Sequence, residues 1–171
     1  MKAYMGLTFR PDAYNEVLKK LFFDLRIDQQ NAFLLFGPVD ILIRFSNLAN
    51  VEEFVEKWVN PIRMLGAKDD MIARTMSLIV ATEGPTCAEK PFAFVFLNTK
   101  PQSTEYVRTK LLALPEVLSA DTVLGPFDVI CSIKAEDRED LETSVLVIQQ
   151  ITGLESSVTS IVLPIKVLPD W

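Results

Sequence analysis

The sequence predicts an α+β fold made of two copies of one unit, each running strand, helix, strand, strand, helix, strand. The first observation is an internal repeat, because Gly37-Pro38-Val39-Asp40 recurs 88 positions later as Gly125-Pro126-Phe127-Asp128. Apolar residues flank both copies, so each is expected to join the two strands of a hairpin through a type II′ turn. A repeat of roughly 85 residues fits twice into the chain, which indicates a duplication.

The second observation is that the order of apolar patterns is the same in both halves. The first half is expected to form strands at 3–9, 32–36, 39–45 and 72–80, with helices beginning after Pro11 and near Val51. The second half is expected to form strands at 92–97, 117–124, 127–133 and 158–165, with helices after Pro101 and around Leu141. Pro61 removes a backbone donor, so the helix there is expected to kink or end near Asn60. This order is the β-α-β-β-α-β arrangement of ferredoxin-like units.

The third observation concerns the strands, which are almost continuously apolar rather than alternating. Residues 92–97, 41–43 and 77–80 illustrate the pattern, which is typical of strands buried on both faces. The helices would cover one face of each sheet, and the simplest cover for the other face is the second sheet. The predicted fold is therefore two ferredoxin-like repeats packed sheet to sheet as an intramolecular pseudo-dimer, like a dimeric α+β barrel.

The predicted boundaries follow from one stretch of different composition. Residues 82–91 are small or polar and contain two prolines, so they are interpreted as a linker. Residues 1–81 then form the first repeat, and residues 92–171 form the second repeat with a short C-terminal tail.

Charge and residue usage exclude several classes of function. The net charge is −6 and the basic residues are scattered, which opposes a nucleic-acid surface. The chain has no histidine, which removes histidine-based triads and most zinc sites. Cys87 and Cys131 form neither a disulfide framework nor a metal motif. No membrane span or signal peptide is apparent, so the expected location is cytoplasmic, and no metal or cofactor is predicted.

The sequence also leads us to expect that the protein is not an enzyme. A small enzyme with this pair of sheets would need polar groups on the inner faces of its strands. Arg44 and Ser132, at corresponding hairpin positions, are the only candidates for such groups. Fold alone does not decide the matter.

The second half resembles the effector-binding domain of Lrp/AsnC-type regulators. The residues that carry the resemblance are the hairpin loop Gly125-Pro126-Phe127-Asp128, then Asp137 and Leu141, and finally the stretch 153–163 with Gly153 and Thr159. The resemblance covers residues 92–165. The first half keeps Gly37 and Asp40. In this alignment Arg74 and Met76 take the positions of Ser157 and Thr159, and four extra residues separate Gly66 from Ser77.

What the resemblance implies is a small-molecule sensing and oligomerisation module. Domains of this family associate through their sheets and bind effectors, typically amino acids, at interfaces. By position, the ligand-binding residues would be Gly125, Asp128, Ser157 and Thr159, with Gly37 and Asp40 as weaker equivalents. The expected partners are a small-molecule effector, further copies of the chain, or other Lrp/AsnC-type proteins. There is no room for a helix-turn-helix before Ala3, so direct binding to DNA is not expected.

Several alternatives stay open at this point. An aspartate that closes a hairpin more often hydrogen-bonds nearby backbone than a ligand, and strand hydroxyls such as that of Ser157 are common. Pro38 and Pro126 remove a backbone N–H that could hold a ligand carboxylate. The protein could then be a pure interaction module that pairs with full-length regulators, or a small dimeric α+β barrel enzyme.

Overall fold

A computed structural model describes residues 1–166 of the chain. The described chain divides into two compact units, one of residues 1–79 and 163–166, and one of residues 80–162. From residue 167 on, the predicted tail lies outside the described residues, and this part includes Trp171. Within residues 1–166, every helix is too short or too polar to cross a membrane.

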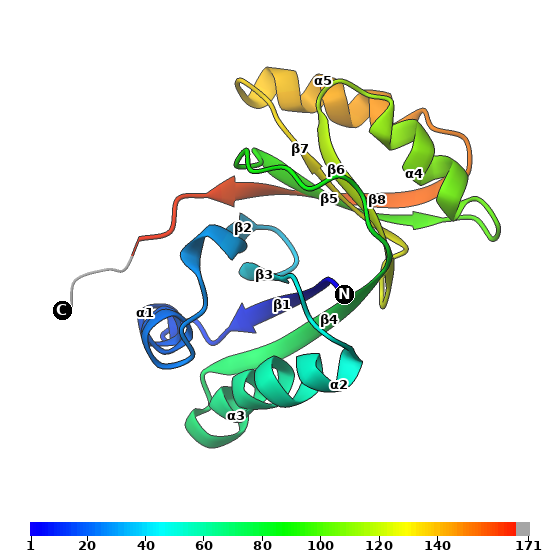
Figure 1. The fold of residues 1–171 in the computed structure, drawn as a ribbon. Coiled ribbons are helices and arrows are strands. Elements are labelled where there is room, and N and C mark those ends of the chain that lie inside the picture. The colour runs from blue at the N-terminus through cyan, green and yellow to red at the C-terminus, as the bar shows by residue number, and fades with distance from the viewer. Residues whose placement is uncertain (167–171) are drawn as a thin grey trace. The chain divides into compact units, whose positions relative to one another are not determined.

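The first unit is a four-stranded antiparallel sheet with its helices on one face (Figure 1). Its elements are β1 (Ala3–Phe9), α1 (Tyr14–Lys19), β2 (Ala32–Phe36), β3 (Ile41–Phe45), α2 (Val51–Phe54), α3 (Asn60–Asp69) and β4 (Ile72–Thr82). The strand order is β4-β1-β3-β2. The central strands are therefore the first and third in sequence, as in a ferredoxin-like unit.

The second unit repeats this plan. Its elements are β5 (Ala93–Thr99), α4 (Thr104–Leu112), β6 (Val117–Leu124), β7 (Val129–Ile133), α5 (Arg138–Gln149) and β8 (Leu154–Leu163). The strand order is β8-β5-β7-β6, and α4 and α5 lie together on one face of this sheet (Figure 1). The predicted fold class, α+β with two ferredoxin-like repeats, is confirmed.

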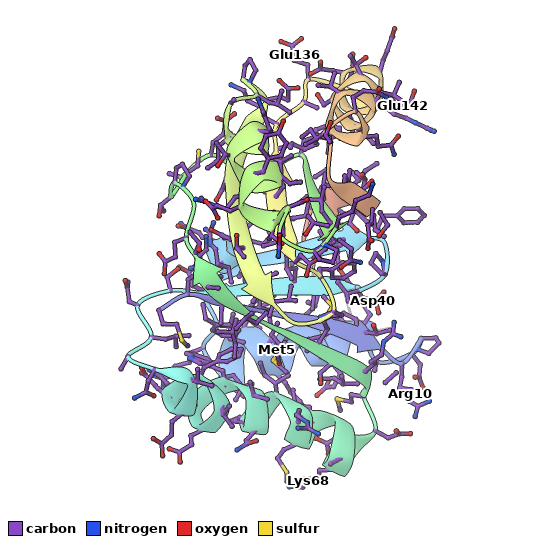
Figure 2. All side chains as sticks on the ribbon, turned by 90° about the vertical axis from the view of Figure 1, so that its right-hand side faces the viewer. Met5, Arg10, Asp40, Lys68, Glu136 and Glu142 are labelled. Atoms are coloured by element: carbon purple, nitrogen blue, oxygen red, sulfur yellow. The ribbon has the colours of Figure 1, made fainter. Side chains whose placement is uncertain are left out.

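Each unit has its own core between sheet and helices. In the first unit Met5 and Leu7 of β1 pack with Val17, Leu21 and Ile62, and Figure 2 shows the Met5 side chain between the strands and the helices. In the second unit the core residues are Val95, Leu97, Val107, Leu111 and Ile148. Alternate strand residues supply these cores because successive side chains point to opposite faces of a sheet.

The expected type II′ turns are wrong. Residues 37–40 separate β2 from β3, and residues 125–128 separate β6 from β7, so each connection is a four-residue loop. The φ angle of Gly125 is 155°, far from the roughly +60° that a type II′ turn needs at its first central residue.

The register of the sheets corrects the predicted alignment of the repeats by one residue. Ser77 lies opposite Met5, and Thr159 lies opposite Val95, which is the counterpart of Met5. Ser77 therefore corresponds to Thr159 rather than to Ser160. By the same register Thr75 corresponds to Ser157, so both units carry hydroxyl residues at these two positions.

Three boundaries differ from the prediction. The helix that contains Pro61 does not end near Asn60, because a π-helical turn at Val55–Val59 leads into α3. Gly66 lies inside α3 instead of ending it, and the left-handed residue that ends the helix is Asp70, with φ 50°. The last strand, β8, begins at Leu154, directly after Gly153 with φ 96°.

Candidate functional site

Asp128 ties the end of the second hairpin loop to the first strand of its unit. Its Oδ2 atom accepts hydrogen bonds from the Thr99 backbone N–H at 2.8 Å and from the Thr99 hydroxyl at 3.3 Å. Its own backbone N–H donates to the carbonyl of Leu97 at 2.9 Å, and its carbonyl accepts from the N–H of Val123 at 2.9 Å. The aspartate is thereby fixed on both sides of its loop.

Asp40 makes the same contacts with backbone groups in the first unit. Its Oδ2 accepts from the Phe9 backbone N–H at 2.6 Å. Its N–H donates to the carbonyl of Leu7 at 2.8 Å, and its carbonyl accepts from the N–H of Leu35 at 2.9 Å. The internal repeat seen in the sequence is thus a repeated three-dimensional hydrogen-bond motif.

The reason for this motif lies in the strands β1 and β5. Each loses its regular register at its last residue, between Thr8 and Phe9 in β1 and between Asn98 and Thr99 in β5. On the opposite side, pairing with β3 ends at Leu7 and pairing with β7 ends at Leu97, so the N–H two residues further on, of Phe9 or Thr99, has no strand partner there. A buried or half-buried N–H needs an acceptor, and the aspartate of the adjacent loop supplies it.

The glycines of the two loops lie at exposed hairpin tips. Gly37 and Gly125 are both exposed, and each follows a large apolar residue that is also exposed, Phe36 by 75% and Leu124 by 62%. Behind the tip of the second unit, the ring of Phe127 packs on that of Phe96 with centroids 5.1 Å apart. The aromatic residue of the motif is therefore explained by packing.

Ser157 and Thr159 lie on β8, separated from the Asp128 loop by strand β5. Leu97 of β5 pairs with Val129 on one side and with Ser157 on the other. Two strand spacings amount to roughly 10 Å, so Asp128 and Ser157 are not within hydrogen-bonding distance. The six predicted site residues therefore form separate groups: the loops, and the hydroxyls of β8.

A hollow of about 440 Å³ lies beside Thr159, between β8 and α5. Its lining residues are Arg138, Leu141, Glu142, Val145, Leu146, Gln149, Thr159 and Ile161. Its walls are mostly apolar. At its rim, Arg138 Nε donates to Glu142 Oε1 at 3.0 Å, and Figure 2 shows Glu142 on the outer side of α5.

The sequence analysis named Ser132 on the second sheet, but it missed other polar side chains there. On its face away from the helices, β-pairing aligns Ser160, Phe94, Ser132 and Ser119 in one row across four strands. Asp121 on the same face is fully buried and accepts the Gly84 N–H at 2.7 Å. Within residues 1–166 the hydroxyl oxygens of Ser119 and Ser160 are buried without a hydrogen-bond partner.

These residues were overlooked because single serines within apolar runs carry no pattern of their own. Alternation around Phe94 and Phe96 could have assigned them to one face. The expectation that the strands offer almost no inward polar group is therefore wrong for the second unit.

Cys131 lies on the helix-facing side of the same sheet and is fully buried. Burial raises the pKa of the Cys131 thiol, and the carboxylates of Asp121 and Glu116 raise it further. A thiol that stays protonated is a poor nucleophile, so Cys131 acts as a core residue. Among residues 1–166 there is no cluster of three or more histidine, cysteine, aspartate or glutamate side chains placed to hold a metal ion.

The fold is shared with enzymes, which contradicts the expectation that the protein is not one. Siroheme decarboxylase NirDL, solved with an iron-uroporphyrin III analogue, superposes on 94% of this chain and 70% of its own, with a TM-score of 0.65 and 8% identity. At that identity the likeness concerns the fold alone. The argument from missing inward polar groups also fails at Ser119, Asp121 and Ser160.

Sequence comparison points to a regulatory family for the second half. Residues 92–167 match the profile of the Lrp/AsnC ligand binding domain. The HTH-type transcriptional regulator FL11 of Pyrococcus furiosus is 27% identical over 73 residues, which are 43% of this chain and 48% of that regulator. The chain thus spans about half the length of this curated relative.

A solved structure is also similar to part of the chain. Hypothetical protein PHS023 from Pyrococcus horikoshii is 27% identical and is covered over 89% of its length by 43% of this chain, with a TM-score of 0.40. The resemblance seen in the sequence is confirmed, because residues 92–167 match the Lrp/AsnC ligand binding domain.

Proposed function

We propose that the protein is a small-molecule sensing and oligomerisation module of the Lrp/AsnC regulator type. The observation that carries this proposal is the match of residues 92–167 to the ligand-binding domain of that family. The regulator FL11 is similar over 73 residues of the chain. The partners would be further copies of the chain or other proteins of this type.

The hollow beside Thr159 is the proposed ligand site of the second unit. Leu141, Val145 and Ile161 offer apolar surface, while the Thr159 hydroxyl and the rim ion pair offer polar contacts. Such a site suits a small amphipathic molecule with both charges, such as an amino acid, because Arg138 can meet a carboxylate and Glu142 an ammonium group.

The exposed hairpin tips support the oligomerisation half of the proposal. Phe36 and Leu124 occupy corresponding positions and expose most of their side chains. Repeated apolar residues at loop tips are suitable contacts for another protein surface. A ligand that binds one assembly better than another would shift the population toward that assembly, and this shift would be the signal.

The test combines thermal unfolding with light scattering across a panel of amino acids. A ligand that binds only the folded protein raises the melting temperature by mass action, and the scattering mass should change with it. Thr159→Val removes one half-buried hydroxyl from the hollow and should weaken ligand binding by up to about tenfold, the value of one hydrogen bond.

The matched control is Thr109→Val, which removes an exposed hydroxyl on α4. It should leave the ligand effect unchanged. If no amino acid changes either the melting temperature or the mass, the sensing role is wrong and the protein is better described as an interaction module. The hairpin tips would then be the place to look for its partner.

A further inference from the structure

We propose that a second hollow, in the first unit, is a binding site for a small organic carboxylate that carries an apolar group. The hollow has a volume of about 280 Å³ and is formed only by residues 26–58. The residues that carry the proposal are Arg26, Arg44 and Trp58. It is independent of the proposed sensing function, because it concerns other residues and another ligand chemistry.

Arg44 presents its guanidinium group in a fixed orientation. Its Nε and Nη2 atoms donate to the same oxygen, Asn31 Oδ1, at 3.2 and 3.0 Å. Its Cζ atom lies 5.5 Å from the ring centroid of Phe33. Stacking and hydrogen bonding together restrict the side chain, so little further entropy is lost when its remaining N–H groups bind an anion.

Arg26 adds a second cation and an unusual backbone. Its φ angle is 55°, and Asn47, which lines the same hollow, has φ 59°. Positive φ is uncommon for residues other than glycine, and it concentrates at ligand sites. Two of the four such residues in the part of the chain described here therefore meet at this one hollow.

The charges of the hollow favour an anion, although the whole chain has a net charge of −6. Three cationic side chains, Arg26, Arg44 and Lys57, face two carboxylates. Within residues 1–166, neither arginine forms an ion pair with a carboxylate, whereas Glu53 already accepts the Ala49 N–H at 2.6 Å and lies 3.7 Å from Lys57. Two guanidinium groups are thus left to bind a ligand.

The wall formed by Trp58 indicates that the ligand also carries an apolar group. The Trp58 ring packs on Phe45 at a centroid distance of 5.0 Å and is half-buried, so part of its surface faces the hollow. The small volume limits the ligand to about the size of a single ring with one acidic group, since larger pockets serve drug-sized molecules. The carboxylates of Asp28 and Glu53 at the rim oppose a dianion, which favours a carboxylate over a phosphate.

The experiment uses Trp58 fluorescence in a Trp171→Phe background, because the chain has two tryptophans. Phenylacetate is the probe, with benzylamine and inorganic phosphate as comparison ligands. A saturable change with phenylacetate alone is the expected result. No saturable change, or tighter binding of benzylamine or phosphate, would overturn the proposal.

Two variants and one control locate the site. Arg44→Gln and Arg26→Gly should each weaken phenylacetate binding by tenfold or more, about the value of a charge-assisted hydrogen bond. Glycine suits the positive φ of residue 26, so Arg26→Gly should fold at least as well as the parent. Arg63→Gln makes the same charge change on the exposed side of α3 and should leave binding unchanged. Equal weakening by all three variants would show a general charge effect and reject the site.

Discussion

At the scale of single residues, one carboxylate fixes the same corner of both units. Asp40 and Asp128 each accept the N–H of the residue that ends the first strand of the unit, at 2.6 and 2.8 Å. This contact accounts for the aspartate of the repeated loop without any ligand. The aspartates also hold the exposed tips in place, so they position the loops that we assign to protein association.

Replacing either aspartate should therefore lower stability. Asp128→Ala or Asp40→Ala leaves a strand-end N–H without its acceptor, and the expected loss is about 1–3 kcal/mol in the free energy of unfolding. Denaturant unfolding followed by circular dichroism measures it. Asp12→Ala, at an exposed position, should change stability by less than about 0.5 kcal/mol. Equal effects at all three positions would contradict the structural role.

The sequence repeat identified both aspartates, but it could not distinguish a structural contact with backbone from binding of a ligand. A repeat of four residues shows that something is kept twice, and it does not show whether the partner is backbone or ligand. The partners, Phe9 and Thr99, lie about 30 positions away in sequence and come close only through the register of the strands. Side-chain hydrogen bonds across such separations have no signature in a sequence pattern.

At the scale of elements, the second helix of each unit begins with the same reciprocal cap. Asn50 Oδ1 accepts the Glu53 N–H while Glu53 Oε2 accepts the Ala49 N–H. In the second unit Asp137 Oδ1 accepts the Asp140 N–H, and Asp140 Oδ2 accepts the Glu136 N–H. The acidic run at 136–140 thus caps and begins α5.

Removing a cap should weaken the helix that it begins. Asp137→Ala is expected to lower the free energy of unfolding by about 1 kcal/mol, whereas Asp137→Asn, which keeps an acceptor oxygen, should cost only a few tenths. Thermal unfolding of the two variants compares them directly. Similar losses for both would mean that the charge of Asp137, rather than its hydrogen bond to the Asp140 N–H, stabilises α5.

The bounds of helices and strands could be predicted where an apolar pattern extends over many residues. They could be predicted less well where particular hydrogen bonds decide the backbone geometry. The strand at Ala3–Phe9 and the strand at Val117–Leu124 have the predicted bounds. The π-helical turn at Val55–Val59 was not foreseen, because it changes hydrogen-bond partners and leaves the apolar stripe intact. The predicted alignment of the two repeats was wrong by one residue, because the correspondence between β4 and β8 follows only from their pairing with β1 and β5.

At the scale of the whole molecule, the hairpin tips are the expected sites of self-association. Phe36→Ser combined with Leu124→Ser replaces both exposed apolar residues, and the association constant should fall by about tenfold or more, as for central interface residues. Concentration-dependent light scattering measures the change. The control is Phe23→Ser, which removes an apolar side chain that is 68% exposed elsewhere.

If the double variant left the association constant unchanged, the self-association contact would not involve the hairpin tips. The fold itself is compatible with either a regulator or an enzyme, since siroheme decarboxylase shares it over 94% of the chain. Assignment to the Lrp/AsnC type therefore depends on residues 92–167 and their sequence match rather than on architecture.

The difference between Arg44 and its counterpart has a consequence for stoichiometry. The second unit has Ser132 at the position of Arg44, as the equivalent pairings with Tyr4 and Phe94 show. A symmetric pair of identical chains would carry this arginine in both copies, whereas this chain has it in the first unit and Ser132 at the corresponding position of the second. Calorimetric titration with phenylacetate should accordingly saturate at one molecule per chain, with a single enthalpy step and no cooperativity between the halves.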